Sequence, residues 1–365
     1  MKILYLANIR LPTEKAHGIQ IMKTCEAFAR LGHKVELVVP TRRTHIADDP
    51  FTYYDVDKNF ALSMLRVPDF VRFGRFGFLL SALLFSERAR FLRSFWEADV
   101  IYSRDAFVLL QYLLLGRKLV FEAHAGLQGV SGFVARHAYR VVAISHGVRD
   151  AFVAAGVPSA ACVVAPDGID LDAFAQSEPK DAARVRLGLP LDKKIVLYAG
   201  RLDGWKGVGT LCDAAALLPE DVLVSIIGGE PGQVAAFAER YPRVRFLGYR
   251  PYRELPGNQA AADVLVLPNT GKDETSVRYT SPLKLFTYMA SGVPIVTSDT
   301  PATREVLSDD DAYFFTPDDP DALAAQARAI LGDEYAAHAR AERAKEKVKE
   351  YTWTKRVEHI LAAIR

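Results

Sequence analysis

The sequence has no uninterrupted apolar run of the roughly 18 residues that a membrane span needs, and its start, MKILYLANIR, is too short and strand-like for a secretory signal. Its three cysteines, Cys25, Cys162 and Cys212, lie far apart without metal-ligand spacing, so we interpret them as reduced core residues. Neither sign of charge dominates, because 46 Lys and Arg stand against 44 Asp and Glu. Nucleic acids usually require a larger basic excess. We therefore expect a cytoplasmic protein with no nucleic-acid partner.

Short apolar runs, by contrast, are abundant. Half of the 365 residues are hydrophobic, so the chain can bury large cores, and its length suggests two or three domains. Runs of Val, Ile and Leu alternate with helical patterns throughout, which is typical of parallel sheets built from βαβ units in an α/β fold. The predicted strands are 2–8, 34–40, 99–105, 118–124 and 140–145 in the first half, and 194–200, 222–229, 244–248, 263–268, 293–298 and 311–315 in the second.

A change of composition divides the chain, because turn-forming and acidic residues replace the periodic pattern near its middle. We predict two doubly wound, Rossmann-like domains that face each other across a cleft. Open parallel sheets bind ligands beyond the carboxyl ends of their strands, so the ligand is expected between the halves. The predicted parts are a first Rossmann-like domain at 1–166, a linker at 167–192, a second Rossmann-like domain at 193–345, and a C-terminal helix at 346–365 that returns to the first domain.

Two cations follow the strand predicted at 194–200. Arg201 and Lys206, in GRLDGWKG, would lie just past its carboxyl end. There a guanidinium fork and an ammonium can hold a diphosphate from two sides, and Gly200 lets the backbone come close. The alternative is a solvated turn with two surface cations.

A third cation stands at a predicted helix start. Ser281 suits the N-cap, Pro282 the first helical position and Gly292 the end, which places Lys284 in the first turn. A cation there costs about 0.3–1 kcal/mol, because the helix start attracts anions. A diphosphate bound by this helix start and the loop 269–280 would reverse that cost. The alternative is that the Lys284 stem lies along the surface with its head in water.

Several segments together resemble the family-4 retaining glycosyltransferases, in the right order and over nearly the whole chain. The resemblance implies the GT-B fold, with an acceptor-binding domain at 1–166 and a nucleotide-sugar-binding domain at 193–345. It also implies transfer of a hexose-type sugar, with retained anomeric configuration, from a nucleotide diphosphate sugar such as a UDP-sugar or GDP-sugar to a lipid-linked or glycan acceptor. The segments are HGIQIMKTCEAFARLGHKVELV, FEAHAG, AISHGVRD, APDGIDLDAF, GRLDGWKG, VRFLGYRPYRELP, ADVLVLPN and SPLKLFTYMASGVPIVTSDTPATREVL.

The resemblance also implies roles for residues. Arg201 and Lys206 would neutralise the donor diphosphate without a metal ion or other cofactor, and His124 would lie close to the transferred sugar. Gly18 would let the chain approach the sugar and the acceptor, although a glycine that simply starts a helix fits as well. A structural histidine is likewise the alternative for His124. The donor-binding residues are Gly200, Tyr249, Glu274, Ser281, Pro282, Leu283, Lys284 and Thr287.

One departure from the family pattern concerns the ribose. The family usually places two glutamates eight positions apart around this helix start, and the second binds the ribose. Here those positions hold Tyr279 and Thr287. Losing a carboxylate that accepts from ribose hydroxyls would weaken donor binding by roughly 1.5–3 kcal/mol, so Thr287→Glu is expected to tighten it. Glu274 or Asp273 could supply the missing ribose-binding carboxylate. The alternative is that both are ordinary acids in a solvated loop. Thr287 itself can donate a hydrogen bond back to the carbonyl of Leu283.

Segment 66–96 alternates arginines with phenylalanines. Basic residues beside apolar ones suit the surface of an anionic bilayer, where a lipid-linked acceptor would be met, and this predicts a peripheral enzyme at the inner face of the membrane. The alternative is an ordinary helix with its apolar face in the core and its arginines in water.

Two other functions fit the same architecture. A nucleotide-sugar epimerase would need acids placed around the sugar, and the sequence shows none. A non-catalytic nucleotide-sugar or glycan-binding module is favoured by Thr287. Slow release of nucleotide from the donor without acceptor would distinguish an enzyme from such a module.

Overall fold

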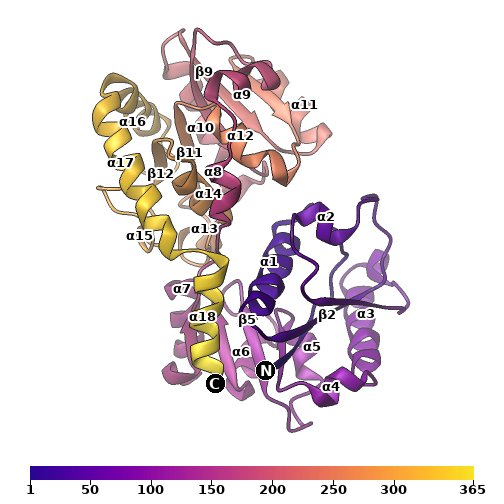
Figure 1. Cartoon of the computed structure of the whole chain (residues 1–365). Helices are drawn as coiled ribbons and strands as arrows, with labels where there is room; N and C mark the ends of the chain where they lie inside the picture. Colours follow the sequence, from indigo (N-terminus) through magenta and orange to yellow (C-terminus); the bar gives the residue numbers. More distant parts are fainter. The chain divides into compact units, whose positions relative to one another are not determined.

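The computed structural model describes residues 1–365 and divides into two compact units (Figure 1). The first unit comprises Met1–Gly168 and Trp353–Arg365, and the second comprises Ile169–Thr352. Each unit is built around one parallel sheet, so the predicted α/β fold with two Rossmann-like sheets is confirmed. None of the helices combines the length and the apolar character needed to cross a bilayer.

The first unit contains a seven-stranded parallel sheet in the order β3-β2-β1-β4-β5-β6-β7. The five predicted strands are all present, whereas the two outer strands, β3 and β7, were not predicted. These edge strands are only partly buried and therefore lack the continuous apolar runs of the inner ones. The strands are β1 (Lys2–Leu6), β2 (Lys34–Pro40), β3 (Ala61–Leu65), β4 (Val100–Ser103), β5 (Leu119–Ala123), β6 (Arg140–Ala143) and β7 (Cys162–Val164).

Local sequence signals fix several helix ends in this unit. The Asp105 carboxylate accepts from the backbone N–H groups of Phe107 and Val108 at 2.9 and 3.2 Å, so Asp105 is the N-cap of α5. Gly32 follows the end of α1 with a φ of +81°. The helices are α1 (Ala16–Arg30), α2 (Pro50–Tyr54), α3 (Gly74–Ala89), α4 (Arg93–Glu97), α5 (Ala106–Leu110), α6 (Ser131–His137), α7 (His146–Ala154) and α18 (Trp353–Ile364).

The last helix, α18, belongs to the first unit although 184 residues of the second unit precede it. It contacts α1, β6 and β7. Its inward face buries five apolar side chains. They are Trp353, Val357, Ile360, Leu361 and Ile364.

The second unit contains a six-stranded parallel sheet in the order β10-β9-β8-β11-β12-β13, and all six strands were predicted. The strand order reverses between β8 and β11, and ligands of such sheets bind beyond the carboxyl ends at this point. The strands are β8 (Lys194–Ala199), β9 (Val222–Ile227), β10 (Val244–Gly248), β11 (Val264–Leu267), β12 (Ile295–Ser298) and β13 (Tyr313–Phe315).

Half of the predicted linker at 167–192 is helical, and from Ile169 onward it belongs to the second unit. Its α9 buries Ala183 and Leu187 in the core of that unit. The flanking Pro179 and Gly188 are turn formers and obscured this short helix in the sequence. The helices of the unit are α8 (Leu171–Ala175), α9 (Lys180–Leu187), α10 (Val208–Ala214), α11 (Pro231–Arg240), α12 (Leu255–Ala260), α13 (Glu274–Val277), α14 (Leu283–Ser291), α15 (Pro301–Arg304), α16 (Pro320–Gly332) and α17 (Glu334–Lys347).

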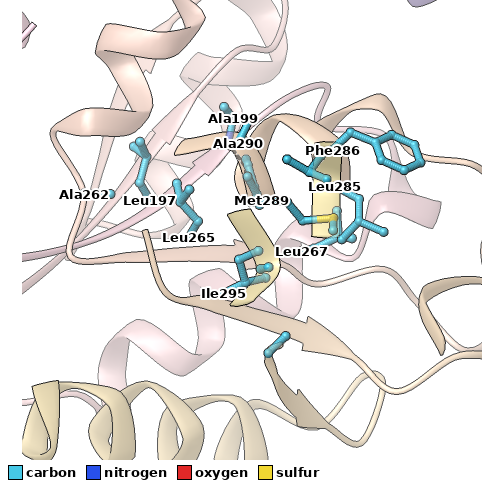
Figure 2. Packing of buried hydrophobic residues seen from close by; sticks show 14 of the residues in the cluster. Leu197, Ala199, Ala262, Leu265, Leu267, Leu285, Phe286, Met289, Ala290 and Ile295 are labelled. Carbon is cyan, nitrogen blue, oxygen red and sulfur yellow. Dashed lines mark hydrogen bonds between the residues drawn. The ribbon is translucent and has the colours of Figure 1, made fainter. Parts of the chain in front are cut away.

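Helix α14 is held against the sheet by its apolar face. Leu285, Phe286 and Met289 are fully buried in one cluster with Leu265 and Ile295 of the neighbouring strands (Figure 2). Burying each such side chain contributes about 1.5–3 kcal/mol, so the start of α14 is fixed relative to the strand ends. This matters because the predicted donor site includes that helix start.

Candidate active site

The predicted helix start is displaced by one position. Pro282, with φ −73° and ψ 113°, is the N-cap of α14, so Ser281 lies outside the helix and is not its N-cap as expected. An extended proline cannot be the first helical residue, and α14 therefore begins at Leu283. Ser281 and Pro282 carry the chain into the helix, and Lys284 stays in the first turn.

The Lys284 ammonium lies over the carboxyl end of β8. Its Nζ donates to the Tyr198 hydroxyl at 2.6 Å and lies 4.0 Å from the centroid of that ring. The Tyr198 hydroxyl in turn donates to the carbonyl of Arg201 at 2.7 Å. A Cβ at Gly200 would come within 2.5 Å of Lys284 Nζ, so a glycine is needed beside the ammonium. The alternative, a Lys284 head directed into water, is wrong.

Lys206 reaches the same strand end from a short 3₁₀ turn, Gly204–Lys206. Its Nζ lies 3.4 Å from the centroid of a Trp205 ring. The loop is backed by the chain that follows β11, because a Cβ at Gly207 would lie only 1.7 Å from the Pro268 carbonyl oxygen. With a φ of +66°, Gly207 also adopts a backbone conformation that favours glycine.

The electrostatics of this loop favour an anionic ligand. Burial, together with the charge of Arg201, lowers the pKa of Lys206 to about 7, although Asp203 opposes the shift. Burial, with Lys206 as the nearest cation, also lowers the pKa of Lys284. Neither lysine has a carboxylate partner in an ion pair, whereas Arg201 is 66% exposed and pairs with Asp203 at 3.1 Å. A phosphate group would supply the missing negative charge.

The predicted ribose-binding acids lie on or before α13. Asp273 caps that helix by accepting from the Ser276 backbone N–H at 3.1 Å, so its carboxylate has a structural role. Glu274 is exposed and accepts from the Tyr279 hydroxyl at 2.9 Å. The residue at the first family glutamate position, Tyr279, thus contacts one of the candidate substitutes. Tyr249, directly after β10, is also exposed.

Thr287 is 1% exposed and already bonded within the second unit. Its hydroxyl donates to the carbonyl of Lys284 at 2.9 Å, one residue later than the Leu283 carbonyl considered from the sequence. The same oxygen accepts from Gln259 Nε2 at 2.8 Å. In this structure the side chain therefore faces α12 and its own helix.

His124 directly follows β5 in the first unit, at the carboxyl edge of that sheet. Its Nε2 contacts Glu122 Oε1, and the ring keeps 18% of its surface exposed. Glu122 is completely buried and also meets Gln20 Nε2 at 2.5 Å and Arg356 Nη2 at 2.9 Å. The Tyr102 hydroxyl donates to the other carboxylate oxygen.

Charges around this cluster set its protonation. Burial would raise the pKa of Glu122, but Arg356 and the other donors hold it well below its usual range, so the carboxylate is ionised. Burial lowers the pKa of His124, and Arg104 lowers it further, so the imidazole is neutral at neutral pH. Arg104 is linked to the cluster through Gln20, because Arg104 Nη1 donates to Gln20 Oε1 at 2.7 Å.

Gly18 lies inside α1 rather than in the loop before it. A Cβ at this position would come within 2.1 Å of the Tyr54 hydroxyl oxygen. That hydroxyl accepts from the Thr13 N–H and donates to the Thr13 carbonyl, both at 2.7 Å. Packing within the first unit therefore requires a small residue at position 18.

The arginine-rich segment leaves large apolar side chains exposed. Helix α3 buries Phe85 together with small residues such as Gly77, Ser81 and Ala82, but leaves Phe76 79% exposed. An ordinary amphipathic helix would bury all of its large apolar side chains. Other exposed apolar residues of this segment are Val71, Phe73, Phe78, Leu83, Phe91 and Trp96.

Several residues of these clusters were not found from the sequence. Tyr198 and Trp205, which contact the two lysines, look like ordinary strand and turn residues. Glu122 offered a signal, because a glutamate inside a buried strand is rarely without a partner. Its partner, Arg356, is 234 residues away along the chain, and no local pattern connects them. No group of three His, Cys, Asp or Glu side chains is placed to hold a metal ion.

Known protein families match both halves of the chain. Residues 18–173 match the model of the glycosyltransferase family 4, and residues 193–333 match that of the glycosyl transferases group 1. A D-inositol 3-phosphate glycosyltransferase of Xylanimonas cellulosilytica is 26% identical over 87% of this chain and 83% of its own. A phosphatidyl-myo-inositol mannosyltransferase of Mycolicibacterium smegmatis is 32% identical over 52% of this chain and 48% of its own.

The solved structures establish the fold. HepE of Anabaena, determined in complex with UDP-glucose, superposes with a TM-score of 0.77 at 19% identity over 99% of both chains. Two Rossmann-like units of this kind define the GT-B fold, and the chain is a glycosyltransferase. It belongs to the family-4 glycosyltransferases, which confirms the predicted family.

Proposed function

We propose that this enzyme transfers a hexose-type sugar from a nucleotide diphosphate sugar, with retention of anomeric configuration and without a metal ion, to a hydroxyl of a lipid-linked or glycan acceptor. The observation that carries the proposal is the convergence of Arg201, Lys206 and Lys284 at the carboxyl end of β8. Two of these cations are half-buried without a carboxylate partner. This group is called the cation clamp below.

The clamp acts on the leaving group. As the glycosidic bond breaks, negative charge accumulates on the diphosphate, and fixed cations in a partly desolvated site stabilise that charge. Arg201 supplies a planar fork for phosphate oxygens, and the lysines supply compact charges. The acceptor hydroxyl then attacks from the face that the diphosphate leaves, with the leaving phosphate taking its proton.

Known relatives support a uridine nucleotide as donor. HepE, which shares the fold, binds UDP and UDP-glucose. Relatives named for transfer to inositol phosphate or phosphatidyl-inositol make a hydroxyl on a phosphorylated or lipid-linked acceptor a reasonable proposal here. UDP-sugars are therefore the first donors to test, followed by GDP-sugars.

The test combines a binding screen with donor hydrolysis. Thermal-shift measurements with UDP-, GDP- and ADP-sugars should identify one nucleotide that stabilises the protein, because a ligand bound only by the folded state raises its stability. The protein should then slowly release that nucleotide from its donor in EDTA. With an acceptor, NMR of the product should show the donor's anomeric configuration; an inverted product would contradict the retaining assignment.

The clamp itself is tested by substitution. Arg201→Ala and Lys206→Ala should each lower turnover by at least about a hundredfold, because each removes a donor aimed at the developing charge. Lys349→Ala removes an exposed lysine paired with Glu346 and serves as a matched control at wild-type rate. Near-normal rates in both clamp variants would overturn the proposal.

We also propose that α3 and its flanks bind an anionic bilayer. Large apolar side chains exposed along one segment mark an interaction surface, and unpaired arginines in the same segment complement anionic lipid headgroups. The exposed arginines of the segment that make no ion pair are Arg66, Arg72, Arg75 and Arg88.

Flotation with liposomes tests this surface. The protein should float with vesicles that contain phosphatidylglycerol and not with pure phosphatidylcholine. Binding should vanish when three of the unpaired arginines become Ser, and also when Phe73 and Phe76 become Ser. A control with the same charge change replaces the exposed Arg240, Lys345 and Lys349 of the second unit with Ser and should still float. Equal flotation of all variants would contradict the assignment.

A further inference from the structure

A buried ion pair lies at the centre of the first unit. Glu122 is completely buried, Arg356 is 3% exposed, and Arg356 Nη2 donates to Glu122 Oε1 at 2.9 Å. Such a pair adds little net stability compared with apolar residues of similar volume, because desolvation of two charges offsets their attraction. Stability alone therefore does not explain why α18 directs an arginine into this core.

The pair fixes the orientation of one carboxylate. The Tyr102 hydroxyl from β4 donates to Glu122 Oε2, while Gln20 of α1, Arg356 of α18 and His124 all meet Oε1. An ionised carboxylate can only accept hydrogen bonds. The nitrogen of His124 that faces it, Nε2, must therefore carry a hydrogen.

The consequence concerns the other ring nitrogen. A neutral imidazole has one donor and one acceptor nitrogen, so His124 Nδ1 is an acceptor. It makes no hydrogen bond within the protein, and the ring is partly exposed. Arg104 is the cation near this ring besides Arg356, and it is engaged with Gln20. Nδ1 is therefore available to a ligand.

We propose that Arg356, acting through Glu122, is a positioning residue that holds His124 as the Nε2–H tautomer and presents Nδ1 to a hydroxyl of the bound sugar or acceptor. This inference rests on the proposed transferase function and assigns α18 a part in it. The carboxylate is oriented before any ligand arrives, so no reorganisation is needed during the reaction. The His124–Glu122–Arg356 arrangement is called the histidine relay below.

The tautomer can be measured directly. In ¹⁵N-labelled protein, the chemical shifts of the imidazole nitrogens distinguish a protonated from an unprotonated nitrogen, and loss of one signal set in His124→Gln identifies His124 among the eight histidines. The wild type should show a protonated Nε2 and a bare Nδ1. Glu122→Gln puts an amide beside the ring that can donate as well as accept, so both tautomers should appear. A protonated Nδ1 in the wild type, or an unchanged tautomer in Glu122→Gln, would overturn the inference.

Kinetics test the role of Arg356. Arg356→Met alone would leave the buried Glu122 carboxylate without a cation and would destabilise the fold. The informative variant is therefore Glu122→Gln/Arg356→Met, which removes both charges at similar volume. Its kcat should fall about tenfold to a hundredfold, the effect typical of side chains that orient a functional histidine. Its KM for the donor should stay unchanged, because the cation clamp lies in the second unit. Arg356→Lys keeps the positive charge beside Glu122, so its kcat should lie between those of the double variant and the wild type.

A matched control lies on the same helix. Glu358→Gln changes an exposed glutamate of α18 and should leave kcat at the wild-type value. A wild-type kcat in the double variant, in protein shown to be folded, would overturn the histidine relay. If no nucleotide sugar is turned over by the wild type, the proposed function fails, whereas the tautomer measurement still decides the positioning of His124.

Discussion

At the residue scale, Lys206 makes donor binding depend on pH. Its pKa, lowered to about 7 by burial and by Arg201 despite Asp203, means that part of the lysine is neutral at pH 7 and most of it at pH 8. A bound diphosphate favours the charged form, so binding above pH 7 must take up a proton. Affinity for UDP-glucose should therefore be constant below about pH 7 and fall up to about tenfold per pH unit above it.

Calorimetry in buffers of different ionisation enthalpy measures this proton uptake at pH 8. UDP-glucose is the suitable ligand, because its diphosphate has no group that titrates near neutrality. In Lys206→Arg the guanidinium stays charged, so most of the uptake should disappear, leaving only the part due to Lys284, whose pKa burial also lowers. Binding heats that do not depend on the buffer would show that Lys206 is already charged in the free protein.

Thr287 is expected to behave differently from the sequence-based prediction. The resemblance predicts tighter nucleotide binding for Thr287→Glu. In the structure, however, the side chain is buried between Gln259 and the Lys284 carbonyl, so a longer acid would have to enter a packed site. Burying a carboxylate there should lower the melting temperature and leave UDP affinity unchanged or weaker. Thr287→Ser, which retains the hydroxyl, is the control; tighter UDP binding by Thr287→Glu in a titration would restore the original assignment.

The site residues that could be predicted are those placed by strand ends. Arg201 and Lys206 follow a clear strand, and Lys284 lies in the first turn of a helix with a recognisable apolar stripe. Their convergence followed from the rule that parallel strands end at one edge. The histidine relay could not be predicted, because α18 brings Arg356 to Glu122 through tertiary packing alone. The contact between the Tyr198 hydroxyl and Lys284 Nζ likewise arises from tertiary packing and has no local sequence signal.

At the element scale, the inner strands were predictable because burial on both faces makes them continuous apolar runs. The partly buried edge strands β3 and β7 lack that signal. The short helices α8 and α9 were not recognised within the predicted linker, because acids and turn formers such as Pro179 and Gly188 flank them. Helix α14 was predicted with its start one residue early, because Pro282 suits the N-cap as well as the first helical position.

The loop that carries Lys206 depends on one glycine. At Gly207 a Cβ would lie 1.7 Å from the Pro268 carbonyl oxygen, and the φ of +66° is unfavourable for alanine. Gly207→Ala should therefore lower the free energy of unfolding by about 1–3 kcal/mol and weaken UDP-sugar binding, because Lys206 moves with the loop. Urea denaturation and a UDP titration measure the two effects.

Gly204 in the same loop provides the matched control. A Cβ there would meet no atom within 4 Å. Gly204→Ala should thus change stability by no more than about 0.5 kcal/mol and leave UDP binding intact. If the two variants behaved alike, the contact with Pro268 would not be what holds the clamp loop.

At the scale of the whole molecule, the two units differ in how the chain builds them. The second unit is one continuous segment, Ile169–Thr352, whereas the first is completed only by Trp353–Arg365. The chain passes between the units at two places that are bonded to each other, because the Ile169 N–H donates to the Tyr351 carbonyl at 2.9 Å. During synthesis from the N-terminus, the second unit is therefore complete before the last helix of the first unit, α18, has been made.

Removing residues 353–365 should accordingly unfold the first unit and spare the second. The deletion exposes the core against which five apolar side chains of α18 pack, at about 1.5–3 kcal/mol each, and it leaves the buried Glu122 without Arg356. That loss is comparable to the 5–15 kcal/mol by which whole domains are stable. Circular dichroism should show loss of part of the helical signal, and a UDP-sugar should still protect the second unit against proteolysis, because its cation clamp is intact. Cleavage of both units at the same rate with ligand present, or full retention of structure without α18, would contradict the view that the last helix belongs to the first unit alone.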